Sequence, residues 1–210
     1  MNYIIYDLEL NSKPFKSNLP NEIIEIGAVK LDKNLQEIGK FQAFIKPKYF
    51  KKLFSLVKRK TKITQEDINK ADDFKKVIKN FQQWIGSDCV LISWGHDDIY
   101  NLSLNCRYNR IKIGWLKQNI DIQKQFSSIF NLPSSQRYSL KNALKLLEIE
   151  VLDDFHRALT DAEYTSKIFK CIFDKVNFKM FNTIKPFKKK NFKRKSNSKK
   201  STCTPNAKDA

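Results

Sequence analysis

Four acidic residues and one histidine, spread over three separate parts of the chain, have the types and spacing of a catalytic site. They are Asp7, Glu9, Asp98, His156 and Asp161. Carboxylate oxygens are the ligands that Mg²⁺ and Mn²⁺ prefer, and a histidine can accept a proton near neutral pH. These residues in this order predict a two-metal site that hydrolyses phosphodiester bonds.

The first pair, Asp7 and Glu9, falls in a segment rich in aromatic and branched residues that suits a central strand. Residues i and i+2 of a strand project from the same face, so the two carboxylates point together. Their charges repel each other unless cations neutralise them. Alternatively, the pair is two solvated acids at a strand edge, and an Asp-x-Glu motif alone is a weak signal.

The second part is Trp94-Gly95-His96-Asp97-Asp98, directly after a continuous apolar run of strand length. Sites of α/β proteins lie at such strand ends, and the glycine permits a sharp turn into a helix. Leu102 lies on the same helix face as Asp98, which leaves Asp98 toward the cleft. Acids at a helix start also stabilise the helix dipole, and that role fits Asp97 better. The choice between the two as a metal ligand stays open.

The third part is Phe155-His156-Arg157-Ala158-Leu159-Thr160-Asp161-Ala162. Within one helix, five residues would separate His156 from Asp161 by ~140°. We therefore expect His156 on the loop that enters the helix, as a proton acceptor beside a rigidly held ligand. A single histidine before a helix is more often a plain polar loop residue, and the two upstream parts favour the catalytic interpretation.

The elements that position these residues are predicted from apolar periodicity. Three strands are expected over residues 3–10, 22–31 and 38–45, which suggests an antiparallel meander. Further strands are expected over 89–94 and 116–120. Helices are expected from a threonine cap at Thr64 and over residues 72–85, 98–107, 121–130, 139–147 and 158–173. A meander followed by strand–helix alternation predicts an α/β domain with a mixed sheet.

The motif set resembles the DEDDh group of 3′-to-5′ exonucleases. The segment Glu22-Ile-Ile-Glu-Ile-Gly-Ala-Val-Lys-Leu is similar to the second strand of that family. The segment Thr61-Lys-Ile-Thr-Gln and the Trp94-Gly95 context resemble the subgroup containing the histone-mRNA 3′ exonuclease and the KapD proteins. The resemblance covers nearly all of the predicted folded part, residues 1–182. Lys62 replaces a glycine usual in that subgroup, and Asn11 replaces a frequent threonine.

The resemblance implies a ribonuclease-H-like fold, a five-stranded mixed sheet with helices on both sides. It implies two divalent cations, Mg²⁺ or Mn²⁺, with Asp7 bridging both. Glu9 and Asp161 would hold the ion that activates water, Asp98 would serve the other ion, and His156 would be the general base. Leu10 and Asn11 would contact the terminal nucleotide. The expected activity is 3′-to-5′ hydrolysis of single-stranded nucleic acid, RNA favoured, to nucleoside 5′-monophosphates.

The net charge of +18 favours a polyanionic partner, although an AT-rich genome would also enrich lysine. Residues 185–210 hold ten Lys or Arg and one Asp. We predict a disordered basic tail over 183–210. Phe187-Lys-Lys-Lys-Asn-Phe-Lys-Arg-Lys interleaves aromatics with cations, which suits single-strand binding. A tail that only solubilises the protein or acts as a targeting signal is the alternative.

Other protein classes find less support. No apolar run is long enough to span a bilayer, no signal peptide is recognisable, and we expect a cytoplasmic protein without membrane contact. The four cysteines form no CxxC pair, so we expect reduced thiols, with the two near the middle of the chain in the core. No GxGxxG follows the first strand, and no organic cofactor is expected. Two alternatives stay open: a DNA-directed exonuclease of the proofreading or repair type, and a catalytically inactive RNA-binding module.

Overall fold

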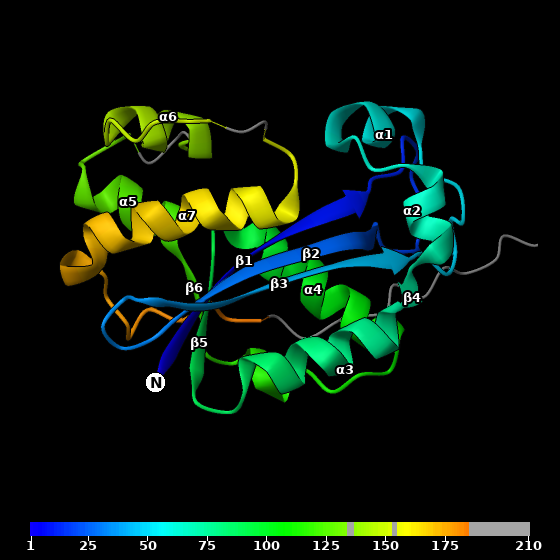
Figure 1. Ribbon diagram of the computed structural model, residues 1–210, viewed down its shortest axis with the longest axis horizontal. Coiled ribbons are helices and arrows are strands. Elements are labelled where there is room, and N and C mark those ends of the chain that lie inside the picture. The colour runs from blue at the N-terminus through cyan, green and yellow to red at the C-terminus, as the bar shows by residue number, and fades with distance from the viewer. Residues whose placement is uncertain (134–136, 153–154, 185–210) are drawn as a thin grey trace, which may run out of the picture.

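A computed structural model describes residues 1–133, 137–152 and 155–184 of the chain. Its centre is a mixed sheet with the strand order β4-β3-β2-β1-β5-β6 (Figure 1). The strands are β1 (Asn2–Asn11), β2 (Glu22–Leu31), β3 (Glu37–Lys46), β4 (Asp72–Asp73), β5 (Cys89–Ser93) and β6 (Asn119–Asp121). β1, β2 and β3 are antiparallel, while β5 pairs in parallel with both β1 and β6. The predicted α/β class and antiparallel meander are confirmed.

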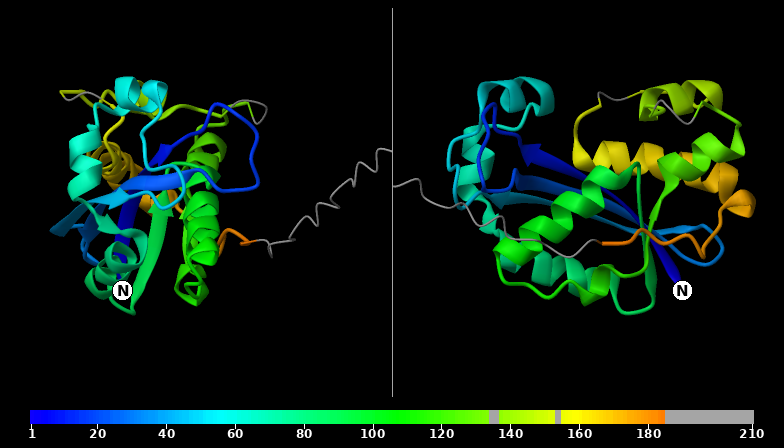
Figure 2. Two further views of the ribbon diagram at one scale, coloured as in Figure 1. Left: turned by 90° about the vertical axis from the view of Figure 1, so that its right-hand side faces the viewer. Right: turned by 180° about the vertical axis from the view of Figure 1, so that it is seen from behind.

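Helices cover both faces of the sheet (Figures 1 and 2). On one face lie α3 (Phe74–Ile85) and α4 (His96–Tyr108), and on the other lie α5 (Ile122–Ile129), α6 (Leu140–Leu146) and α7 (Ala158–Ile172). Two short helices, α1 (Ser55–Thr61) and α2 (Gln65–Lys70), follow β3. Two short 3-10 turns complete the described elements, at Gly114–Leu116 and Phe173–Lys175.

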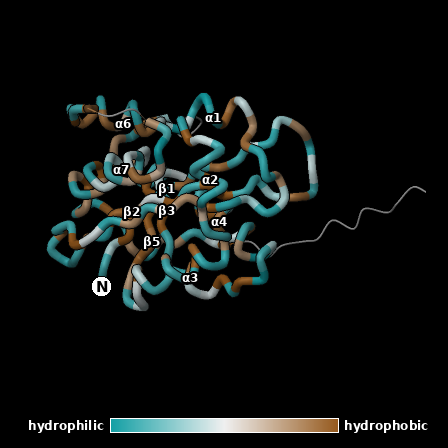
Figure 3. Tube along the Cα trace, turned by 45° about the vertical axis from the view of Figure 1, so that its right-hand side comes forward, coloured by the Kyte–Doolittle hydropathy of each residue, from teal (hydrophilic) through white to brown (hydrophobic). Residues whose placement is uncertain are grey.

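The alternation of β1 decides which residues face which helices. Ile4, Tyr6 and Leu8 join the core beneath α3 and α4. Tyr3 and Ile5 join the opposite core beneath α5, α6 and α7. Asp7 and Glu9 continue the second series, so their side chains project on the α7 side. Along the chain, apolar segments gather in the central layer and hydrophilic segments at the periphery (Figure 3).

The structure departs from the sequence predictions in a few places. The resemblance implied five strands, whereas the described residues form six, because Asp72–Asp73 pairs with the end of β3. The helix expected over 72–85 accordingly begins at Phe74, with Asp73 as its cap. α4 begins two residues earlier than predicted, directly after Gly95, whose φ is +107°. The strand expected over 116–120 is β6, and Leu116 belongs to the preceding turn.

Helix α1 was not predicted. Its N-cap, Phe54, makes no side-chain hydrogen bond, and Val57 and Thr61 are its buried residues, so the segment carries little helical periodicity. Within the described part of the chain, no helix combines the length and apolarity that crossing a membrane would need. Cys89 and Cys106 are buried, as predicted, and unpaired. The predicted tail lies outside the described residues from position 185 onward.

Candidate active site

Asp7 and Glu9 lie next to each other on one face of β1, as their spacing requires. Opposite them on β2 are Gly27, which pairs with Asp7, and Glu25, which pairs with Glu9. Glu9 is buried and Asp7 is half-buried. Two carboxyl groups are therefore presented from an otherwise apolar strand toward the helix that crosses this face.

Gly27 allows that helix to approach. A Cβ atom at this position would lie 2.1 Å from the backbone nitrogen of Leu159 and 2.3 Å from the carbonyl carbon of Ala158. Real Cβ atoms do not come so close, so only glycine permits the first turn of α7 to rest on the backbone of β2. The contact places Asp161, in that first turn, beside β1.

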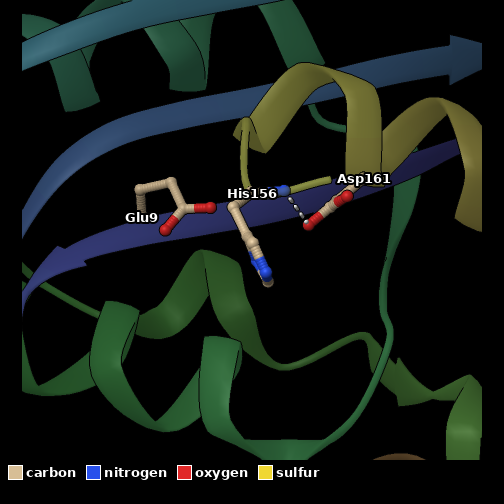
Figure 4. A group of neighbouring side chains, drawn as sticks. All are labelled: Glu9, His156 and Asp161. Atoms are coloured by element: carbon tan, nitrogen blue, oxygen red, sulfur yellow. Dashed lines mark hydrogen bonds between the residues drawn. The ribbon is translucent and has the colours of Figure 1, made fainter. Parts of the chain in front are cut away.

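Glu9, His156 and Asp161 come together at this place (Figure 4). One ligand atom from each of the three side chains lies within 4.8 Å of the other two. His156 lies two residues before α7, on the entering loop. Its backbone nitrogen donates a hydrogen bond of 3.3 Å to Oδ2 of Asp161. His156 has a φ of +77°, a left-handed conformation that few non-glycine residues adopt.

A buried ion pair fixes the loop that carries His156. Arg157 donates to both carboxylate oxygens of Glu25, at 3.2 Å from Nε and 2.9 Å from its terminal nitrogen. The backbone nitrogen of Ala158 donates to the same carboxylate at 3.2 Å. Gln42 on β3 supplies a further donor at 2.7 Å. Glu25 has no exposed surface, so its charge is balanced entirely by these partners, which hold the start of α7 against β2.

Sequence reasoning missed both Gly27 and the Glu25–Arg157 pair. A signal was present, because Glu25 and Gly27 share one strand face and interrupt an otherwise apolar strand. That signal indicates a special position, but it does not identify Arg157, 132 residues away along the chain, as the partner.

The structure separates the roles of Asp97 and Asp98. Asp97 is exposed and forms an ion pair of 2.7 Å with Arg137. Asp98 is half-buried, and its charge acts on the buried side of the first turn of α4, where it raises the pKa of Asp7. Of these two acids, Asp98 therefore faces the carboxyl group of β1.

Burial and mutual repulsion shift the protonation of the whole acidic set. The pKa of Asp7 is raised well above its ordinary value by burial and then by the charge of Asp98. Burial and the neighbouring Asp97 raise the pKa of Asp98 well above its ordinary value. Burial also raises the pKa of Glu9 to about 7 and that of Asp161 to about 6. Such a set is costly to ionise unless cations neutralise it.

The chemistry of these groups fits divalent cations. Oδ1 of Asp161 is buried and has no hydrogen-bond partner among the described residues, although buried carboxylate oxygens are normally paired. The surrounding donors are carboxylate oxygens and one imidazole, the ligands of hard or borderline divalent ions. An ion at this place would supply the partner that Asp161 lacks.

One cation of the protein also acts on the site. Lys60, in the last turn of α1, lowers the pKa of Glu9 and of Asp161 by its positive charge, against the larger effect of burial. The pKa of His156 is lowered by burial and then by the same lysine. Lys60 was not predicted as a site residue, because the helix that carries it was not predicted either.

Leu10 and Asn11, predicted to contact nucleotide, follow Glu9 at the end of β1. Leu10 is half-buried and packs against the α3–α4 core. Asn11 is fully buried; its amide nitrogen donates to the carbonyl oxygens of Phe50 (3.0 Å) and Lys52 (3.1 Å), and its carbonyl oxygen accepts from the backbone of Phe54 (3.1 Å). The side chain of Asn11 is thus committed to the loop after β3, and a nucleotide contact stays a prediction.

The sequence matches known proteins over most of the described chain. The profile of the family described as Exonuclease matches residues 4–169. The chain is 29% identical to 3'-5' exoribonuclease 1 of Mus musculus over 158 residues, 70% of this chain and 46% of that protein. It is 28% identical to the probable 3'-5' exonuclease KapD of Bacillus subtilis over 174 residues, 80% of this chain and 83% of that protein.

A polymerase of Bacillus subtilis, DNA polymerase III PolC-type, is 30% identical over 165 residues, 78% of this chain but 11% of the polymerase. The chain thus spans less than half the length of the mouse and polymerase relatives. Among solved structures, the nuclease domain of 3'hExo, described as a DEDDh family member bound to rAMP, superposes with a TM-score of 0.78 at 24% identity, covering 88% of this chain and 97% of that one. This likeness bears on the fold.

Proposed function

The chain belongs to the exonuclease family, and on this premise we propose that it removes nucleotides stepwise from the 3′ end of single-stranded nucleic acid, with RNA favoured. The observation that carries the proposal is the convergence of Glu9, His156 and Asp161 within 4.8 Å, beside Asp7. Residues far apart in sequence supply one proton acceptor and several carboxylates at one point, as metal-assisted hydrolysis needs.

The four acids Asp7, Glu9, Asp98 and Asp161 would hold two divalent cations, Mg²⁺ or Mn²⁺. Bound ions of this kind lower the pKa of a coordinated water and stabilise the charge on a leaving oxygen. The acids of this chain keep the ions in place, and the Glu25–Arg157 pair and Gly27 hold the element that carries Asp161.

His156 would take the proton of the attacking water on an imidazole nitrogen. Burial and Lys60 lower the pKa of His156 below its ordinary value of 6.5, so the neutral, proton-accepting form prevails at neutral pH. The 3.3 Å hydrogen bond from its backbone to Asp161 holds the base at a fixed place relative to that carboxylate. Products are expected to be nucleoside 5′-monophosphates.

The preference for RNA is supported by the mouse relative, named as an exoribonuclease. The polymerase relative keeps a DNA substrate in the test. We further propose that residues 1–182 form the nuclease domain and 183–210 a basic tail, since the family profile ends within the first part. The three described cysteines are unpaired, which suits a reducing, cytoplasmic location.

The test uses matched 5′-labelled single-stranded RNA and DNA of one sequence, digested with Mg²⁺, Mn²⁺ or a chelator. We expect a ladder that shortens from the 3′ end with either ion, none with chelator, and faster loss of RNA. Asp7→Asn should reduce the rate by about 10³-fold or more, since the cation clamp supplies several kcal/mol. Its thermal unfolding should show a folded protein.

Each other outcome has a defined meaning. Faster digestion of DNA would assign a DNA-directed exonuclease. Binding of RNA without turnover under any metal condition would assign the inactive binding module. Full activity in Asp7→Asn, or in chelator, would contradict the metal site.

A further inference from the structure

A second concave site, lined by none of the catalytic carboxylates, lies where the end of β3, the start of α3 and the end of α4 meet. Its volume is about 320 Å³. The lining residues are Lys48, Tyr49, Lys75, Tyr108, Asn109 and Arg110. Figure 2 shows α4 crossing the back of the molecule toward this end. The site thus joins three segments that are distant in sequence.

The lining contains three cations and no acid. Lys48, Lys75 and Arg110 are all exposed, and none of them has a carboxylate within ion-pair distance among the described residues. Single exposed lysines are ordinary surface residues. Three unpaired cations around one hollow raise the local positive potential and attract an anion.

Two tyrosines form the aromatic part of the same site. The rings of Tyr49 and Tyr108 pack edge to face, with centroids 6.4 Å apart and an interplanar angle of 82°. Nζ of Lys48 lies 5.4 Å from the ring centroid of Tyr49. Cations that track a backbone, combined with aromatic rings beside them, are the means by which proteins bind single-stranded nucleic acid without sequence preference.

A buried carboxylate fixes the loop that carries Lys48 and Tyr49. Glu22 accepts hydrogen bonds from the backbone nitrogens of Lys48 (2.6 Å), Tyr49 (3.0 Å) and Phe50 (2.7 Å). The hydroxyl of Tyr108 donates to the carbonyl oxygen of Asn18. The aromatic part of the site is therefore preorganised, which reduces the entropic cost of binding.

The same loop connects this site to the active site. β1 runs from Glu9 to Asn11, and the buried amide of Asn11 binds the loop at Phe50 and Lys52. Phe15, half of whose surface is exposed, packs against Phe50 and against the neighbouring Phe54, both at 5.8 Å. An aromatic surface thus lies between the catalytic carboxylates and the basic pocket.

We propose that the pocket of Lys48, Tyr49, Lys75, Tyr108 and Arg110 is a second nucleic-acid site that binds phosphate and base of the substrate strand upstream of its 3′-terminal nucleotide. The identity of the polyanion rests on the proposed function. The pocket would add affinity for long strands and leave the chemistry of the terminal nucleotide unchanged.

The test measures binding without turnover, in chelator, using 5′-fluorescein-labelled single-stranded RNA of increasing length from three to sixteen nucleotides. The variant combines Lys48→Gln, Lys75→Gln and Arg110→Gln. The matched control combines Lys33→Gln, Lys124→Gln and Lys170→Gln, which removes the same charge from exposed positions on other elements.

With the native protein we expect affinity to rise sharply above a threshold length. The pocket variant should lose that rise, and its salt dependence should fall by ~0.7 log units per phosphate contact, about two for three contacts. The control should keep both. Tyr49→Leu should weaken binding of long strands by roughly 5- to 150-fold, the range measured for loss of one stacking partner. Hydrolysis of a trinucleotide with Mg²⁺ should be unchanged in every variant.

Two results would overturn the proposal. One is equal binding of long strands by the pocket variant and the control. The other is displacement of RNA by poly-glutamate at equal charge concentration, which would assign the pocket to polyanions in general. If the native protein digests no oligonucleotide, the proposed function fails, whereas the length series in chelator still tests the pocket.

Discussion

Glu9 and Asp161 show how burial sets the protonation of a site before any ligand arrives. With pKa values of about 7 and about 6, both carboxyl groups carry protons at a pH where ordinary carboxyl groups are fully ionised. A cation must displace those protons, so its affinity should rise with pH through this window. The residues that make the site reactive also make it unfavourable when empty.

A stability measurement can detect this cost. The folded-state pKa of Glu9, about 7, exceeds its ordinary value of 4.5, so the folded protein binds this proton more tightly than the unfolded chain does. The resulting stability is complete below about pH 4.5 and is lost as the pH rises toward 7. In chelator, Glu9→Gln should therefore lose less stability than the native protein between pH 4.5 and 7. Parallel urea-unfolding profiles of the two proteins would contradict this.

His156 offers a comparison within the chain, since His96 is the only other histidine. His156→Ala should reduce the single-turnover rate by ~10²–10⁴, because a positioned general base contributes that much. His96→Ala removes an exposed imidazole at the start of α4 and should change the rate little. A near-normal rate in His156→Ala would remove it from the mechanism.

At the scale of elements, the site depends on how closely α7 approaches β2. Backbone meets backbone at Gly27, and the Glu25–Arg157 pair holds the same contact from its side. The distance between His156 and Glu9 follows from this contact between a helix and a strand.

Gly27→Ala should therefore be far more damaging than its size suggests. The new methyl group would overlap the backbone of Leu159, at 2.1 Å, and would push α7 away from the sheet. Unfolding free energy should fall by about 1–3 kcal/mol or more, and turnover should fall with it. Gly114→Ala is the matched control, because no atom lies within 4 Å of the added carbon. Similar unfolding curves for the two variants would refute the contact.

Arg157→Gln should leave the charge of Glu25 buried and unpaired. We expect a loss of about 2–4 kcal/mol, below the full cost of breaking a buried pair, because solvent reaches the arginine and screens it. Adding Glu25→Gln should recover part of that loss, and a double-mutant cycle in urea unfolding measures the coupling. Additive effects of the two changes would show that the pair does not fix the start of α7.

Most elements could be predicted from sequence because their signals are local. The bounds of β2 and the start of α7 agree with the residue pattern. α1 could not be predicted, since Leu56 is exposed and successive basic residues obscure its periodicity. The choice between Asp97 and Asp98 also needed the structure, because neighbouring residues share every local signal and only Arg137 distinguishes them.

Across the whole molecule, positive charge is present on several surfaces and is concentrated in the last residues of the sequence. Ile184, the last described residue, packs against the core beneath α3 and α4. That core also includes Ile111, which adjoins Arg110 of the basic pocket. The tail thus begins on the side of the sheet that holds the pocket.

Deleting residues 185–210 should weaken single-strand binding and reduce its salt dependence by ~0.7 log units per lost phosphate contact. Thermal unfolding should be unchanged, since the described core ends before the deletion. A tail of the same composition in scrambled order is the control and should restore binding if charge and stacking suffice. An unchanged salt dependence after deletion would assign the tail another role, such as solubility or targeting.

The backbone of His156 carries a consequence for how this protein can change over generations. Its φ of +77° is one that glycine or asparagine adopts at lower cost. Folding alone would favour either of these residues, so only selection for turnover retains an imidazole there. A lineage released from that selection should drift to glycine or asparagine at this position and become more robust as it loses the reaction.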